Sequence, residues 1–336
     1  MMNNDSTEYL NYLRVFAAFA VVMLHIFSIP ITPSYRECYS SMELFLCKGL
    51  KYLMFWSVPV FVMITGVLFL NPEKELSLAK LFKKYILRFV IVILSFGTLF
   101  CLLELMFKDH SLSFTKICQA ILNSLMGKSW DHMWYIYMVI GLYMVIPLIK
   151  VFVNNVNDKL LFYALGILFC TTSLLPFVKN FLDIENHYSM FSIYIFYLLL
   201  GYVIHYKNFK LNNGLATAFL LLFALYIGII QCGNFTHPRF GYESPIVVLA
   251  AFAFFSLGKN INRKRSKLIK FIGPLTFGVY IVHPVFINVC NKVWHLTSDK
   301  YSLMFSIMSM SLITIIGSIF LVFVLRLIPF VRERVL

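Results

Sequence analysis

Two ionisable side chains, Arg14 and His25, lie in the first apolar stretch of the sequence, at residues 9–29. If this stretch is a helix, the spacing places both side chains on one face, about 16 Å apart along the axis. An imidazole titrates near neutral pH and can act as a general base, whereas a guanidinium stays charged and binds anions. The structural alternatives are an arginine that anchors the helix end and a histidine at a membrane surface.

A further histidine, His283, lies in the apolar run PLTFGVYIVHPVFI and is followed by Pro284. Proline lacks a backbone N–H and kinks helices, so we expect Pro284 to free one backbone carbonyl. The simplest interpretation of His283 is a packing histidine bonded to a neighbouring carbonyl. The alternative is a direct part in chemistry, because an ionisable group inside a membrane is costly and therefore suggests a function.

Charged residues also gather near the ends of apolar stretches. Lys83, Lys84 and Arg88 form a basic cluster. Such a cluster usually sets membrane topology, but lysine and arginine also bind phosphate groups well. Glu243 is either an ordinary interfacial charge or part of a polar lip at the outer end of a span.

Trp134 and Tyr137 begin another apolar stretch. Aromatic residues at such a boundary usually form the membrane belt, and the functional alternative is stacking against a sugar ring. No motif indicates a metal or nucleotide site. The seven cysteines include no C-x-x-C pair, and the sequence has no H-E-x-x-H, no complete P-loop and no G-x-S-x-G. We therefore expect no metal.

The composition indicates which elements hold these residues. Of the 336 residues, 60% are apolar and 13% charged, whereas soluble domains carry about 25% charged residues. We predict an all-α polytopic transmembrane bundle, formed by a single domain over residues 1–336. A span needs roughly 20 apolar residues. The ten stretches that qualify are 9–29, 52–70, 85–107, 133–152, 160–177, 189–204, 214–230, 244–257, 271–293 and 301–327.

The net charge of +14 would favour a nucleic-acid partner in a soluble protein. In this bundle it is explained by basic cytoplasmic loops, because 18 of the 29 Lys and Arg lie on the side of the termini and ten on the other side. The bias predicts that both termini are cytoplasmic, with the lipid bilayer as a partner and no nucleic acid. The longest polar connections, 31–51 and 108–132, would lie outside, and residues 114–126 could form an interfacial helix.

Four stretches, taken in order, resemble one known family. They are NYLRVFAAFAVVMLH, SVPVFVMITGVLFL, HMWYIYMVIGLYMVIPLI and LTFGVYIVHPVFI. Together they resemble the integral-membrane acyltransferase type 3 family over about residues 9–327. The likeness is greatest to bacterial surface-polysaccharide O-acetyltransferases, such as the one that acts on enterobacterial common antigen.

This resemblance implies a multi-pass protein of the inner (cytoplasmic) membrane that transfers an acyl group, usually acetyl, from cytoplasmic acyl-CoA. The acceptor it implies is a hydroxyl of a lipid-linked or surface glycan. The arginine and histidine of the family motif correspond to Arg14 and His25. The family often has Arg-x-x-Arg after the second span. Here Tyr85 stands in the first place and Arg88 in the second, with two lysines just before them.

The resulting hypothesis is acyl transfer from acetyl-CoA to a glycan hydroxyl, with His25 as general base and Arg14 guiding or binding the donor. The CoA phosphates would be held by Lys83, Lys84 and Arg88. Substrate contacts are predicted at Trp134, Tyr137, Tyr280, His283 and Glu243. Two alternatives stay open: a transporter or flippase without chemistry, and an acyltransferase for succinyl or longer acyl donors.

Overall fold

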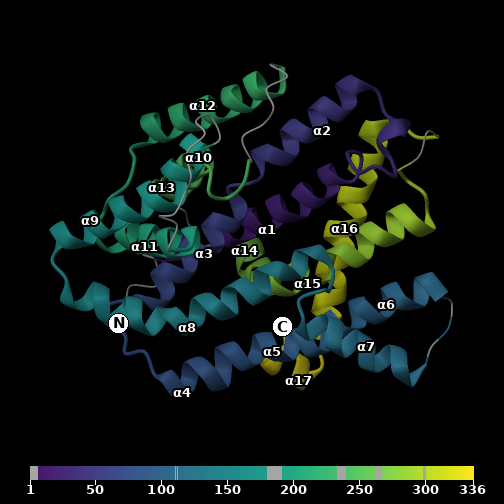
Figure 1. The fold of residues 1–336 in the computed structure, drawn as a ribbon, viewed down its shortest axis with the longest axis horizontal. Coiled ribbons are helices and arrows are strands. Elements are labelled where there is room, and N and C mark those ends of the chain that lie inside the picture. The colour runs from purple at the N-terminus through teal and green to yellow at the C-terminus, as the bar shows by residue number, and fades with distance from the viewer. Residues whose placement is uncertain are drawn as a thin grey trace. The chain divides into compact units, whose positions relative to one another are not determined.

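The computed structural model describes residues 7–109, 111, 113–179, 191–232, 240–261, 266–297 and 300–336. Every regular element in these ranges is helical (Figure 1), as predicted. Eight helical segments of this part are long and apolar enough to cross a membrane: Glu8–Ser28, Ser41–Phe69, Leu78–Phe107, Asp131–Asn155, Asp158–Lys179, Asn213–Gln231, Lys267–Val293 and Leu303–Leu325. The two remaining predicted spans, 189–204 and 244–257, correspond to shorter apolar helices, Ile193–Tyr206 and Pro245–Asn260. Residues 189 and 190 lie outside the described ranges.

The chain divides into two compact units, each made of segments that are distant in the sequence. Unit 1 comprises Met1–Asn71 and Val156–Leu321, and unit 2 comprises Pro72–Asn155 and Val322–Leu336. The helices that lie mainly in unit 1 are α1 (Glu8–Ser28), α2 (Ser41–Leu53), α3 (Ser57–Phe69), α9 (Asp158–Phe169), α10 (Leu175–Lys179), α11 (Ile193–Tyr206), α12 (Asn213–Cys232), α13 (Pro245–Asn260), α14 (Lys267–Ile272), α15 (Thr276–Asn288) and α16 (Leu303–Leu325). Those of unit 2 are α4 (Leu78–Lys80), α5 (Leu87–Val92), α6 (Thr98–Asp109), α7 (Phe114–Leu125), α8 (Trp134–Asn155) and α17 (Pro329–Arg334).

The core of unit 1 is built around a close crossing of α3 and α11. A Cβ placed on Gly66 would lie 2.0 Å from the carbonyl oxygen of Leu198, and one on Gly201 would lie 2.1 Å from that of Met63. Only glycine lets two helix backbones approach so closely. The Tyr206 hydroxyl also donates to the carbonyl of Val67 at 3.0 Å, which joins the same two helices.

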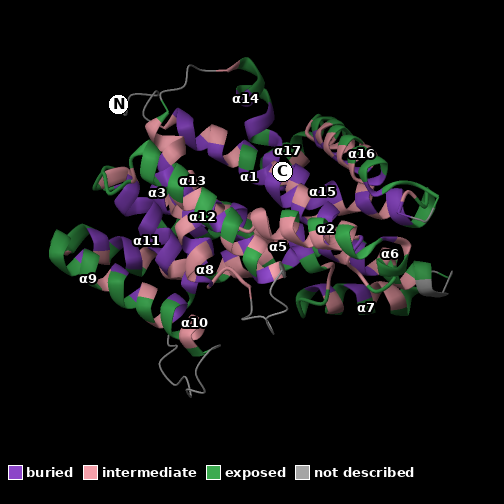
Figure 2. Cartoon of the chain, turned by 90° about the horizontal axis from the view of Figure 1, so that it is seen from above, coloured by how far each residue is buried: buried purple, intermediate pink, exposed green. Residues whose placement is uncertain are grey.

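Helix α1 packs against both α3 and α15 in this unit. Buried residues follow α1 and α11 for most of their length (Figure 2). Nearby, the rings of Trp56 and Phe254 stack at a centroid distance of 3.9 Å, which joins the start of α3 to α13. The helix that carries Arg14 and His25 is therefore held from several sides.

Helix α2 begins at Ser41, inside the stretch 31–51 that was predicted to be a polar connection. That prediction was wrong for its second half. The pattern Ser40-Ser41-Met42-Glu43 forms a capping box: the Glu43 carboxylate accepts from the Ser40 N–H at 2.9 Å, and the Ser40 hydroxyl accepts from the Glu43 N–H at 3.4 Å. A turn after Leu53 then leads into α3.

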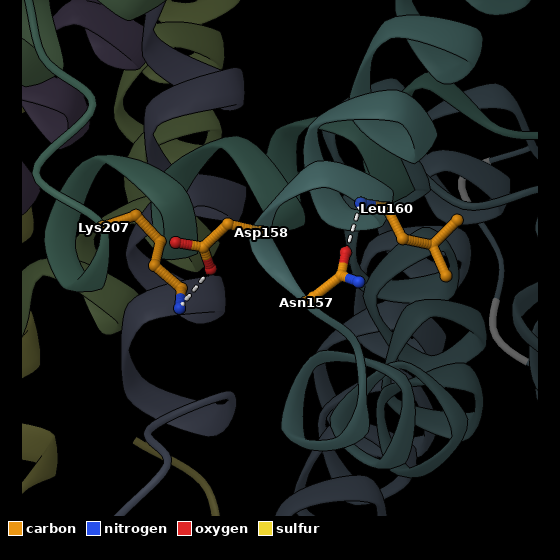
Figure 3. A network of polar contacts seen from close by, with 4 residues as sticks. All are labelled: Asn157, Asp158, Leu160 and Lys207. Atoms are coloured by element: carbon orange, nitrogen blue, oxygen red, sulfur yellow. Dashed lines mark hydrogen bonds and ion pairs between the residues drawn. The ribbon is translucent and has the colours of Figure 1, made fainter.

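The start of α9 is fixed by two polar contacts (Figure 3). The Asn157 side chain caps the helix by accepting from the Leu160 N–H at 2.9 Å. The next residue, Asp158, forms an ion pair of 2.7 Å with Lys207, just past the end of α11. This contact raises the pKa of Lys207. The acidic first turn of one helix is thereby joined to the carboxyl end of another.

Lys259 closes the carboxyl end of α11. Its ammonium donates to the carbonyls of Ile204 at 2.5 Å and His205 at 3.0 Å, and to Oδ1 of Asn208 at 3.2 Å. Carbonyls at the end of a helix have no partner within the helix, so a lysine there satisfies them. The His205 ring is itself bonded through Nδ1 to the Tyr9 hydroxyl at 2.7 Å. This cluster therefore has a structural role.

Unit 2 contains one long helical segment, Leu78–Phe107, in which α-helical stretches alternate with π-helical turns at Leu81–Ile86 and Ile93–Gly97. Helix α7 packs along it, and the Ser124 hydroxyl donates to the Ile93 carbonyl at 2.8 Å. The helix predicted over residues 114–126 is thus confirmed, and it begins after Ser113, whose hydroxyl caps it.

Candidate functional site

His25 and Arg14 belong to one unbroken helix, α1, and both side chains are half-buried. Because the helix runs through both positions without a kink residue, the two side chains keep the one-face relation expected from their spacing. Around them the helix is lined by alanine, valine and leucine residues.

His283 lies on α15 and is completely buried. Its Nδ1 is 2.7 Å from the carbonyl oxygen of Tyr280 and 3.2 Å from that of Val279. A carbonyl oxygen only accepts hydrogen bonds, so Nδ1 is the protonated nitrogen that donates. The expected bond to a neighbouring carbonyl is therefore present, and in the neutral ring the lone pair is on Nε2.

Helices α1 and α15 bring the two histidines together. The rings of His25 and His283 have centroids 5.1 Å apart and planes tilted by 47°. Tyr280 joins the same group, with its ring centroid 6.2 Å from that of His283. Three of the predicted site residues, one on α1 and two on α15, thus form one cluster in unit 1.

Lys51 on α2 adds a cation to this cluster. Its half-buried side chain interacts electrostatically with the His25 imidazole. Lys51 was not among the predicted site residues, because the polarity of residues 31–51 indicates an outer connection. This electrostatic interaction depends on the packing of α2 on α1 and not on spacing along the chain, so no local pattern around Lys51 would have indicated it.

Glu243 lies in another part of unit 1, just before α13. The Ser173 hydroxyl donates to the Glu243 carbonyl at 2.7 Å, and the Tyr197 hydroxyl donates to the Tyr242 carbonyl at 2.7 Å. Burial raises the pKa of the Tyr242 phenol. The Glu243 carboxylate interacts electrostatically with Tyr194 and Tyr197. It therefore lies among phenol groups, a setting that is both aromatic and polar.

The basic cluster belongs to unit 2. Lys83 and Lys84 are exposed on the π-helical turn, and Arg88 is half-buried one turn further on. The Arg88 Nε donates to the carbonyl of Val335 at 3.1 Å. A second guanidinium, that of Arg326, interacts electrostatically with Arg88. Two like charges held together repel each other and attract an anion. From the sequence alone, Arg326 is only one of the charges that set topology.

The two aromatic candidates are also in unit 2. Trp134 is 39% exposed at the start of α8, next to the ring of Tyr135. The Tyr137 hydroxyl donates to the Ser124 carbonyl and so helps join α8 to α7. In the described ranges, no three or more His, Cys, Asp or Glu residues gather as metal ligands would.

Comparison with known proteins identifies the family. The family model described as an acyltransferase domain matches residues 7–327, which cover almost the entire chain and both units. No individual curated protein or solved structure matches. The matched region includes the histidine cluster on α1 and α15 and the basic cluster around Arg88. Because the family model covers almost the entire chain and the helices are long and apolar, the chain belongs to the acyltransferase domain family of membrane proteins.

Proposed function

We propose that this protein transfers an acetyl group from acetyl-CoA to a hydroxyl of a lipid-linked or surface glycan, with His25 as the general base. The observation that carries this proposal is the contact between His25 and His283 within the apolar helices of an acyltransferase domain. An imidazole inside a membrane is costly to keep, and it is the side chain most often used to move protons near neutral pH.

The reaction needs a proton acceptor and stabilisation of negative charge. His25 takes the proton of the acceptor hydroxyl, whose oxygen attacks the thioester carbon. The carbon–sulfur bond then breaks, and the CoA thiolate leaves with the proton from His25. The oxyanion formed between these steps is favoured by a nearby cation. Lys51, which interacts electrostatically with His25, is well suited to that role, and Arg14 guides or binds the donor.

Donor recognition is proposed for the basic cluster of unit 2. The phosphates of CoA would bind Arg88, Lys83 and Lys84, with Arg326 adding charge. The support is the electrostatic interaction between the two guanidiniums, which a bound phosphate would relieve. The acceptor sugar would contact Trp134, Tyr137, Tyr280, His283 and Glu243.

We further propose ten spans with both termini in the cytoplasm. The protein would lie in the inner membrane of a cell that modifies its surface polysaccharide, as enterobacterial common antigen O-acetyltransferases do.

The test is ester formation by the purified protein in lipid nanodiscs. Radiolabelled acetyl-CoA is supplied with octyl glycosides of glucose, galactose, mannose or N-acetylglucosamine as probes. We expect a labelled ester that hydroxylamine cleaves, formed at a rate proportional to enzyme. Succinyl-CoA and butanoyl-CoA in parallel reactions identify the acyl group. A transporter or flippase would leave acetyl-CoA intact under all these conditions, and that result would refute the proposed reaction.

Replacing Arg88 by alanine is expected to raise KM for acetyl-CoA about tenfold or more while kcat changes little. The reason is that one charge-assisted hydrogen bond to a phosphate contributes about 1.5–3 kcal/mol. The measurement is initial rate against acetyl-CoA concentration. Lys128→Ala is the control, because it removes an exposed cation between α7 and α8 of the same unit and should leave KM unchanged.

Arg88 also donates to Val335, so Arg88→Lys separates charge from anchoring. The lysine keeps the charge but does not reproduce the guanidinium Nε–H that donates to the Val335 carbonyl. A phosphate site predicts a smaller rise in KM for lysine than for alanine. Equal rises would show that Arg88 acts by anchoring the carboxyl-terminal segment, and an unchanged KM in both would remove Arg88 from the donor site.

A further inference from the structure

The local structure around Pro284 defines a specific role for His283. In an α-helix the N–H of residue 284 would bond to the carbonyl of Tyr280, four residues earlier. Proline has no N–H, so this carbonyl loses its helical partner inside an apolar helix bundle. The structure shows that the Nδ1–H of His283 takes the vacant place at 2.7 Å. Pro284, which interrupts the backbone hydrogen bonds of the helix, thus orients the imidazole of the preceding residue.

This bond fixes the tautomer of His283. Because Nδ1 carries the proton, the neutral ring has its lone pair on Nε2, and Nε2 can only accept. The second contact of Nδ1, to the Val279 carbonyl at 3.2 Å, favours the same tautomer. The ring is also completely buried, so packing holds its orientation.

The group next to this imidazole is the ring of His25, with a centroid separation of 5.1 Å. The structure itself gives no hydrogen bond at Nε2 of His283, but the His25 ring lies beside it and carries an N–H that could donate to it after a turn of the ring. Resting on the proposed function, we propose that His283 is a positioning residue: in the reacting complex its Nε2 accepts a hydrogen bond from the N–H of His25, and the other nitrogen of His25 acts as the base.

The consequence is a three-part arrangement made of Pro284, His283 and His25. Pro284 removes the helical hydrogen-bond donor of the Tyr280 carbonyl. This carbonyl then fixes the tautomer of His283, and His283 in turn fixes the tautomer of His25. When His25 takes the hydroxyl proton it becomes an imidazolium, and the hydrogen bond to Nε2 stabilises that charge. The proton then passes from His25 to the CoA sulfur. His283 exchanges no proton in this cycle, so its own tautomer is unchanged.

Two amide substitutions test the role, because each keeps one of the two hydrogen bonds assigned to the imidazole. In His283→Asn the side-chain amide can still donate to the Tyr280 carbonyl, but nothing remains at the place of Nε2. In His283→Gln the amide oxygen lies near the place of Nε2 and can accept from His25. The readout is CoA release from acetyl-CoA in nanodiscs with the fastest octyl glycoside, or with water where no glycoside is faster. Thermal stability is measured alongside.

We expect His283→Asn to lower kcat about a hundredfold with little change in KM for acetyl-CoA. We expect His283→Gln to recover most of the lost kcat although it gives up the bond to Tyr280. Equal losses in the two variants would show that His283 acts only through packing, and wild-type kcat in the Asn variant would show that it does not position His25. Either result overturns the proposal.

The failure of this proposal can be told apart from failure of the proposed function. If His25→Ala is inactive while both His283 variants are fully active, His25 remains the base and only the positioning role is lost. If His25→Ala retains wild-type kcat, the general-base mechanism itself is wrong, and the positioning role of His283 falls with it.

Discussion

Alanine in place of His25 is expected to lower kcat for acetyl transfer by about a hundredfold to ten-thousandfold, the usual contribution of a positioned general base. KM for acetyl-CoA should change little, because the phosphates that dominate donor binding are assigned to the basic cluster around Arg88. The protein should remain folded, since alanine favours the helix and His25 is only half-buried. The measurement is the rate of CoA release and of ester formation in nanodiscs.

His205 provides the matched control for this substitution. It is a histidine of the same unit, on the apolar helix α11, and bonds to Tyr9 near the start of α1. Tyr9 lies about 24 Å along the α1 axis from His25. His205→Gln should therefore leave kcat at the wild-type level. Partial recovery of the His25→Ala enzyme by added imidazole would identify the missing group as a base. Equal kcat in wild-type and His25→Ala enzymes would exclude His25 from the chemistry.

The helical architecture was predictable because span length is a local property of the sequence. A run of about 20 apolar residues identifies a span wherever it lies, and eight of the ten predicted stretches became long apolar helices. The other two, which became α11 and α13, are the shortest of the predicted stretches. By contrast, the division into two units depends on contacts between distant segments, and no local pattern indicates it.

Helix α2 shows two local signals in conflict. The capping box formed by Ser40 and Glu43 marks a helix start, and its pattern is visible in the sequence alone. The polarity of the same stretch favours a loop, and that interpretation would leave Lys51 in a connection outside the bundle. The helix that forms packs on α1 and places Lys51 where its charge interacts with the His25 imidazole.

The candidate site was predictable only in part for the same reason. Arg14 and His25 share a helix, so their spacing defines their relation. The relation between His25 and His283 spans most of the chain and arises from the packing of α1 on α15. What the sequence did indicate is the carbonyl freed by Pro284, and the structure shows His283 bonded to it. The fold was needed to show that the imidazole of His283 lies beside the ring of His25.

Alanine in place of Gly66 is expected to destabilise the protein strongly, because the added methyl group would meet the backbone of another helix. The new Cβ would lie 2.0 Å from the Leu198 carbonyl oxygen, and its next neighbours are also backbone atoms of Leu198. A backbone cannot rotate away as a side chain does, so α3 and α11 must separate. We expect a loss of about 3 kcal/mol or more, at the upper end of overpacking effects. The measurement is thermal unfolding in detergent, with size-exclusion chromatography to follow the folded fraction.

Gly201→Ala should behave in the same way, because its Cβ would meet the Met63 carbonyl at 2.1 Å from the opposite helix. Gly166→Ala is the matched control: it lies on α9 of the same unit, with nothing within 4 Å of the added carbon. There alanine should be neutral or stabilising by up to about 1 kcal/mol, since glycine weakens helices. Equal stability of the Gly66 and Gly166 variants would show that the close crossing does not support unit 1. A loss confined to Gly66 and Gly201 would show that the close crossing of α3 and α11 supports unit 1, in which α1 packs on α3.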